Sequence, residues 1–230
     1  MSSITVLFDA SGTLVTPRRS FHELLLSGGT WDIGNPEESI QLALASMGTD
    51  SLWPEDEPDP VLRLKGWYTF LETAIGRSGG VADGASCLNA ARSILDPANY
   101  TEYPDVLPCL ENLRDNHRVR AIGLLSNFDP WLRDILDLLG LTHYFDHISI
   151  SGETGYAKPD PQAVFDAASA LDSELENTVL VGDSMVVDGG AARAAGIRLI
   201  LIDRTGTISY PDTTVINNLE QVPGVLETMQ

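Results

Sequence analysis

Residues 4–14 read ITVLFDASGTL, a short apolar run that stops at an acid and a turn containing glycine. A continuous apolar run of this length is typical of a strand that is buried on both faces of a parallel sheet. In open α/β sheets, ligands bind at the carboxyl ends of the strands. Asp9, the first residue after the run, therefore stands where a functional carboxylate is expected.

The rest of the chain repeats this pattern of buried strands and intervening helices. Asp-Pro pairs predict helix starts at residues 130 and 161, with Asp129 and Asp160 as caps, and Gly140 and Gly196 predict helix ends. Alternating strands and helices predict a doubly wound, Rossmann-like α/β fold with a parallel sheet. The further strands are expected at 119–125, 147–150, 178–181 and 198–202, and the helices at 104–116, 130–139, 161 onward and 191–195.

One long segment breaks the alternation. Between Pro17 and Pro97 there is no strand signal, and helices are expected to begin near Asn35, Asp59 and Val81. An all-helical insertion that leaves a sheet and returns to it is expected to lie over the strand ends. We therefore predict a catalytic core of residues 1–17 and 98–230 with an inserted cap of residues 18–97.

Composition narrows the classes of function and location. The 230 residues carry a formal charge of −19, which argues against nucleic acid and anionic membranes as partners. Cys87 and Cys109 are too few for a disulfide framework, and the N-terminus does not resemble a secretion signal. No apolar run approaches the length of a membrane span. We expect a cytoplasmic protein, and the sequence leaves its oligomeric state open, a homodimer included.

Three acids are expected to meet at the strand ends. Asp9 follows the first strand, and Asp183 and Asp188 follow the strand at 178–181. Three carboxylates at close range cannot all ionise without a cation. Oxygen ligands without histidine or cysteine select a hard ion, and Mg²⁺ is the expected one.

Other residues at the same edge suit a phosphoryl group. Ser126 offers a hydroxyl, Asn127 a backbone N–H, and Lys158 a positive charge. Taken singly, such residues usually lie in turns, cap helices or are solvated at the surface. Together they supply what is needed to hold a phosphoryl group and stabilise its transition state. A carboxylate nucleophile would then form an aspartyl-phosphate that water hydrolyses.

Four motifs in this order resemble the haloacid dehalogenase superfamily, in its helical-cap branch, over nearly the whole chain. They are FDASGTL at 8–14, LLSN at 124–127, YAKPDP at 156–161 and VGDSMVVD at 181–188. The resemblance implies that Asp9 is the nucleophile, that Lys158 is catalytic, and that Ser126 and Asn127 bind the transferring group. It also implies phosphate contacts around Gly12 and Thr13. The implied Mg²⁺ ligands are Asp9, Asp183, Asp188 and the backbone carbonyl of Ser11.

Ser11 departs from the family pattern. Most phosphatases of the superfamily carry a second Asp there, which protonates the leaving group, and its loss costs roughly 10²–10⁴-fold in rate. One reading is a phosphohydrolase whose substrate has a good leaving group or supplies its own acid. A second is a metal-free 2-haloacid dehalogenase or another C–X hydrolase. Asp183, and Val164 in place of a tyrosine, speak against it. A third is a catalytically weak binding protein.

The expected substrate is a small phosphorylated molecule, which the sequence does not name. Arg18 and Arg19 lie just past the first motif, near the entry to the expected site. We hypothesise that one of them, Arg18 being our choice, contacts a second anionic group on the substrate.

Overall fold

The computed structural model describes residues 3–20, 23–24, 28, 64–66, 68–69, 71–72, 83–207 and 210–229. The chain divides into two compact units: one of Met1–Thr16 and Thr101–Gln230, and one of Pro17–Tyr100. These divisions fall close to the domain limits expected from the sequence. That the second unit acts as a cap over the first stays a prediction.

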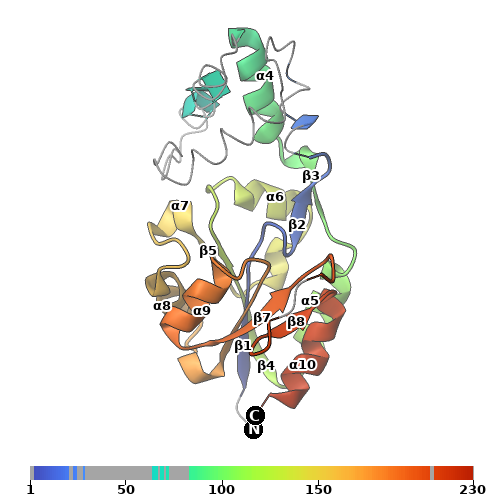
Figure 1. Ribbon diagram of the computed structural model, residues 1–230, viewed down its shortest axis with the longest axis vertical. Coiled ribbons are helices and arrows are strands. Elements are labelled where there is room, and N and C mark those ends of the chain that lie inside the picture. Colours follow the sequence, from blue (N-terminus) through green and yellow to red (C-terminus); the bar gives the residue numbers. More distant parts are fainter. Residues whose placement is uncertain are drawn as a thin grey trace. The chain divides into compact units, whose positions relative to one another are not determined.

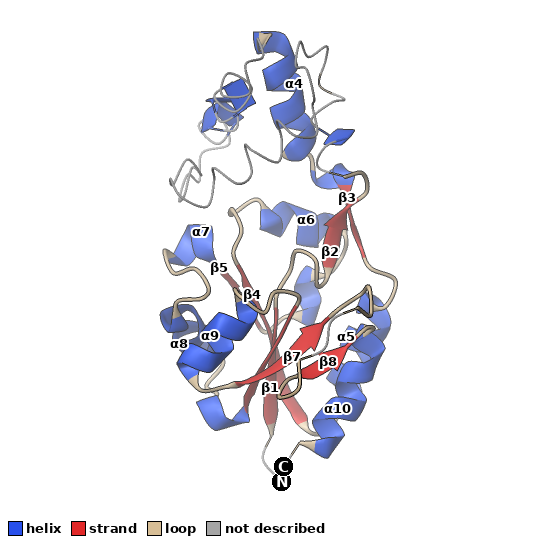
Figure 2. Cartoon of the chain, viewed as in Figure 1, coloured by secondary structure: helices blue, strands red, loops and turns tan. Residues whose placement is uncertain are grey.

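The first unit is built on a six-stranded parallel sheet with strand order β5-β4-β1-β6-β7-β8 (Figures 1 and 2). β1 lies between β4 and β6, so its carboxyl end is flanked by theirs. The strands are β1 (Ile4–Phe8), β4 (Val119–Ser126), β5 (His147–Ile150), β6 (Thr178–Gly182), β7 (Arg198–Ile202) and β8 (Thr214–Ile216). The doubly wound α/β fold is therefore confirmed, with β8 as a strand that the sequence analysis missed.

Helices cover both faces of this sheet (Figure 2). Small and branched side chains of α8 and α9 pack on β1, β4 and β6 in a core that includes Leu7, Leu125, Val164 and Leu180. α5 and α10 pack against each other, and α5 packs on β4. The helices of this unit are α5 (Val106–Asp115), α6 (Leu132–Leu138), α7 (Ser151–Thr154), α8 (Pro161–Ala170), α9 (Asp188–Ala195) and α10 (Val222–Thr228).

Local signals explain most helix ends, with one exception. Asp160 caps α8 by accepting from the Gln162 N–H, and Gly196 ends α9 with a φ of 72° that favours glycine. α6 begins at Leu132, with Trp131 at the N-cap position, and not at residue 130 directly after Asp129. Residues 129–132 form a turn before the helix, in which the Leu132 N–H bonds to the Asp129 backbone carbonyl.

In the second unit, the helix expected near Val81 is α4 (Gly84–Ile94), which Asp83 caps, followed by a short 3₁₀ turn at Pro97–Asn99. The start expected at Asn35 lies outside the described residues, as does the start at Asp59. Residues 64–66, 68–69 and 71–72 are helical. The chain passes between the units through β2 (Val15–Pro17) and β3 (Tyr100–Glu102), a strand pair that the sequence did not predict. Within the described residues, no helix has the length and apolar character needed to span a membrane.

Candidate active site

Three carboxylates meet at the carboxyl end of the sheet. Asp9 follows β1, Asp183 follows the adjacent β6, and Asp188 is the first residue of α9. One carboxylate oxygen from each lies within 4.8 Å of the others. Asp9 and Asp188 are buried, whereas Asp183 is exposed. Parallel pairing of β1 with β6 brings together residues that are far apart in sequence.

Lys158 joins two of these acids. Its Nζ donates to Asp9 Oδ1 at 2.6 Å and to Asp188 Oδ1 at 2.7 Å, and only 1% of its side chain is exposed. Burial by itself would lower the pKa of Lys158, but the charges of Asp9 and Asp188 outweigh burial and raise this pKa above its ordinary value. The ammonium is therefore held charged inside the protein.

The negative charge of the cluster exceeds what Lys158 supplies. Burial raises the pKa of Asp9 to about 6, and Asp188 and Asp183 add to the effect against the opposing charge of Lys158. Burial and Asp188 likewise raise the pKa of Asp183. The raised pKa values mean that the acids of this cluster oppose one another's ionisation, and the cluster offers only oxygen donors. Both properties fit a hard divalent cation such as Mg²⁺.

Glycines make room for this cluster. Gly12 has a φ of 81°, and a Cβ there would collide with Asp183 Oδ2. A Cβ on Gly182 would collide with the carboxyl group of Asp188. Asp188 is held on its other side as well, because its Oδ2 accepts the Ser184 N–H at 3.0 Å. Gly12 and Gly182 therefore let the backbone approach both acids closely, and the hydrogen bonds of Asp188 fix where its oxygens point.

Ser126 is the last residue of β4, next to β1, and Asn127 follows it. The Ser126 Oγ is buried and has no hydrogen-bond partner among the described residues, so it can donate to a bound group. The Asn127 side chain instead holds Lys158. Its Nδ2 donates to the Lys158 carbonyl and its Oδ1 accepts the Lys158 N–H, both at 2.7 Å. The sequence predicts a role for the Asn127 backbone N–H and gives no signal of this side-chain contact.

The remaining expected site residues lie in different surroundings. Ser11 is exposed and forms an isolated bridge with Val15. Thr13 is fully buried, and its Oγ1 has no partner within the described part of the chain. Arg18 belongs to the other unit, where its Nε donates to the Ala98 carbonyl at 3.2 Å. The expected contact of Arg18 with substrate thus remains a prediction.

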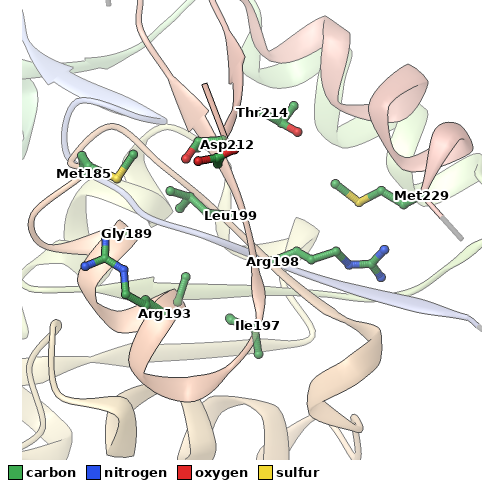
Figure 3. Close-up of a pocket in the computed structure, with 11 residues that line it drawn as sticks. Met185, Gly189, Arg193, Ile197, Arg198, Leu199, Asp212, Thr214 and Met229 are labelled. Carbon is green, nitrogen blue, oxygen red and sulfur yellow. The ribbon is translucent and has the colours of Figure 1, made fainter. Parts of the chain in front are cut away.

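A cavity of about 330 Å³ lies elsewhere in the first unit, beside α9 and β7 (Figure 3). Arg193 and Arg198 line it, but their guanidinium groups point in opposite directions. None of the three carboxylates is among its lining residues. The chemistry that the sequence predicts therefore belongs to the strand ends, not to this cavity.

A doubly wound sheet with three acids and a buried lysine at its strand ends is the arrangement of a hydrolase with an α/β fold. The chain belongs to the haloacid dehalogenase-like hydrolases, whose family model matches residues 5–196. The expected family and the expected hydrolase are both confirmed.

Curated relatives agree with this assignment. A phosphoserine phosphatase of Thermus thermophilus is 31% identical over 70% of this chain and 66% of its own length. Haloacid dehalogenase-like hydrolase domain-containing protein 3 of Danio rerio is 32% identical over 96% of both chains. The chain spans 43–66% of the length of three curated relatives that it matches.

The L-2-haloacid dehalogenase structure from Xanthobacter autotrophicus has a TM-score of 0.72 at 20% identity, covering 99% of this chain and 100% of that one. At this identity, the likeness supports the fold alone.

Proposed function

We propose that this protein is a Mg²⁺-dependent phosphatase that hydrolyses a small phosphorylated molecule through an aspartyl-phosphate on Asp9. The observation that carries the proposal is the cluster of Asp9, Asp183 and Asp188, in which Asp9 and Asp188 bind the buried ammonium of Lys158. A metal-free hydrolase would have no use for three carboxylates at this close range, where burial and then repulsion between the acids raise the pKa of Asp9 and Asp183. The phosphoserine phosphatase relative from Thermus thermophilus points in the same direction.

The cation would be held by Asp9, Asp183, Asp188 and the Ser11 carbonyl. When bound, it supplies positive charge that stabilises the negative charge developing on the phosphoryl oxygens. The chain's own residues do the rest. A carboxylate oxygen of Asp9 bonds to phosphorus as the bond to the leaving oxygen breaks, and water later attacks the same phosphorus and frees Asp9.

Lys158 and Ser126 prepare the site for this charge. The Lys158 ammonium already contacts Asp9 Oδ1, so it neutralises the nucleophile and the phosphoryl group that Asp9 receives. The Ser126 hydroxyl, which has no hydrogen-bond partner in the described part of the chain, would donate to a phosphoryl oxygen. Asn127 keeps Lys158 in place through its two hydrogen bonds to the Lys158 backbone.

The test compares the parent protein with Asp9→Asn on a panel of small phosphate esters and on 2-chloropropionate, each with Mg²⁺ and with EDTA. We expect the parent to release phosphate only with Mg²⁺, and Asp9→Asn to lose this activity by several orders of magnitude. Asp115→Asn, an exposed acid at the end of α5, is the matched control and should be as active as the parent.

Two outcomes would overturn the proposal. Halide release that persists in EDTA would identify a dehalogenase, a reaction that also needs no acid at Ser11. Phosphate release by Asp9→Asn at the parent rate would remove Asp9 from the mechanism altogether.

A further inference from the structure

Arg204 binds the loop that follows Asp9, although the two lie far apart in sequence. It comes two residues after β7, and 21% of its side chain is exposed. Its Nη2 donates to the Thr13 carbonyl at 2.6 Å and its Nε to the Gly12 carbonyl at 3.3 Å. One guanidinium therefore holds two consecutive carbonyls of the loop.

The guanidinium is itself fixed from two further directions. Its Nη1 donates to Asp105 Oδ2 at 2.9 Å, and the same buried oxygen accepts the Leu219 N–H at 2.8 Å. Its carbon atom lies 3.6 Å from the centre of the Tyr103 ring, within the range of a cation–π contact. A surface ion pair would explain only the Asp105 contact, and none of the bonds to the loop.

The loop held in this way contacts the carboxylate cluster. It is defined here as residues 10–14, and it is closed by a hydrogen bond from the Leu14 N–H to the Ala10 carbonyl at 2.7 Å. Gly12 packs so closely on Asp183 that a side chain would not fit. The Ser11 carbonyl, a proposed cation ligand, lies in the same short loop. Any rotation of the Gly12 and Thr13 peptides would therefore move both Asp183 and that carbonyl.

We propose that Arg204 is a positioning residue that fixes the loop of residues 10–14 and, through it, the cation site. This inference rests on the proposed function. Residues that do not bind the metal but hold its ligands in place typically contribute about 10–100-fold in metal affinity or activity. The planar fork of arginine suits several fixed acceptors at once, whereas lysine offers one compact charge. Arg204→Lys should therefore restore only part of the effect.

The first experiment measures binding, not catalysis, by titrating Mn²⁺ as a substitute for Mg²⁺ and following free Mn²⁺ by electron paramagnetic resonance. We expect Arg204→Met to bind Mn²⁺ about 10–100-fold more weakly than the parent. Arg204→Lys and Asp105→Asn should fall between the two. Arg198→Met removes the same charge from β7, at the strand end away from the cluster, and should bind like the parent.

The second experiment follows the loop directly by amide hydrogen exchange. In Arg204→Met, we expect faster exchange at the Gly12 and Leu14 amides, which bond to the Val15 and Ala10 carbonyls. Amides of β4 should exchange as in the parent, which would show that the variant is folded. If Arg204→Met does not fold, the same comparison is made with Asp105→Asn.

The outcomes separate this inference from the function on which it rests. Parent-like Mn²⁺ affinity and loop exchange in Arg204→Met would overturn the role of Arg204 while leaving the phosphatase proposal intact. A parent protein that binds no Mn²⁺ would overturn the phosphatase proposal, and the role of Arg204 at the cation site with it. The exchange data would still decide whether Arg204 holds the loop.

Discussion

Ser11 is the residue at which this site differs from most phosphatases that it resembles. Its side chain is exposed, two residues after the proposed nucleophile, and its hydroxyl is far too weak an acid to protonate a leaving group. Replacing it tests whether the absence of an acid selects the substrate. The exposure of Ser11 leaves room for a longer side chain.

We expect Ser11→Asp to favour substrates with poor leaving groups. The ratio of kcat/KM for an alkyl phosphate to kcat/KM for p-nitrophenyl phosphate should rise by up to about 10²–10⁴-fold, because only the alkyl leaving group needs a proton. kcat/KM isolates this first step from the later hydrolysis of the intermediate. Ser11→Asn, of equal size but without an acidic proton, should leave the ratio unchanged. An unchanged ratio in Ser11→Asp would mean that leaving-group protonation does not limit the reaction.

The sequence identified the side chains that follow strand ends, but not those that act across the fold. Asp9, Asp183 and Lys158 could be found because each lies in a motif that ends a strand or begins a helix. Arg204 could not, since its acceptors are backbone carbonyls 191 and 192 residues away. Backbone carbonyls carry no sequence signal. The side-chain role of Asn127 was missed for the same reason.

At the scale of elements, burial decided which predictions succeeded. β1 and β6 are buried along their whole lengths, so their apolar runs are unmistakable. β8 has only three residues and begins with an exposed threonine, so its pattern resembles that of a loop. The pair β2 and β3 was missed because each has three residues and only the first of each is buried.

The cap of α8 allows a quantitative test at this scale. Asp160 satisfies the Gln162 N–H at the start of a ten-residue helix, and its side chain is exposed. We expect Asp160→Ala to lower the free energy of unfolding by about 0.5–2 kcal/mol, measured by urea denaturation. Asp160→Asn keeps the accepting oxygen and should lower the free energy of unfolding by only about a few tenths of a kcal/mol. Equal losses in both variants would show that charge, not capping, stabilises the helix.

At the scale of the whole molecule, the charge of −19 is the dominant feature of the sequence. Like charges carried by one folded chain repel each other and favour expansion. Exposed ion pairs such as Arg114 with Asp146 and Arg133 with Glu153 offset little of this, because exposed pairs contribute about 0–1 kcal/mol each. Screening by salt should therefore stabilise the fold.

We expect the Tm in Mg²⁺-free buffer to rise as NaCl increases from about 10 mM to about 200 mM, over which the Debye length falls from about 30 Å to below 8 Å. Differential scanning calorimetry measures this shift. Choline chloride at equal ionic strength should give the same rise, since screening does not depend on the identity of the cation. A Tm that falls with salt would show that specific ion pairs outweigh the overall repulsion.

In the first unit, hydrogen bonds join the point where the chain leaves for the insertion to the point where it returns. This arrangement bears on how such proteins diversify. The Tyr103 N–H donates to the Leu14 carbonyl at 3.0 Å, and Arg204 binds both Thr13 and Asp105, so the exit and the return of the chain are tied together. The entropy of closing an inserted loop grows only by about 0.6 kcal/mol for each doubling of its length. The segment between these points can therefore be lengthened, shortened or exchanged in evolution. The register of the sheet and the carboxylates at its edge would stay unchanged.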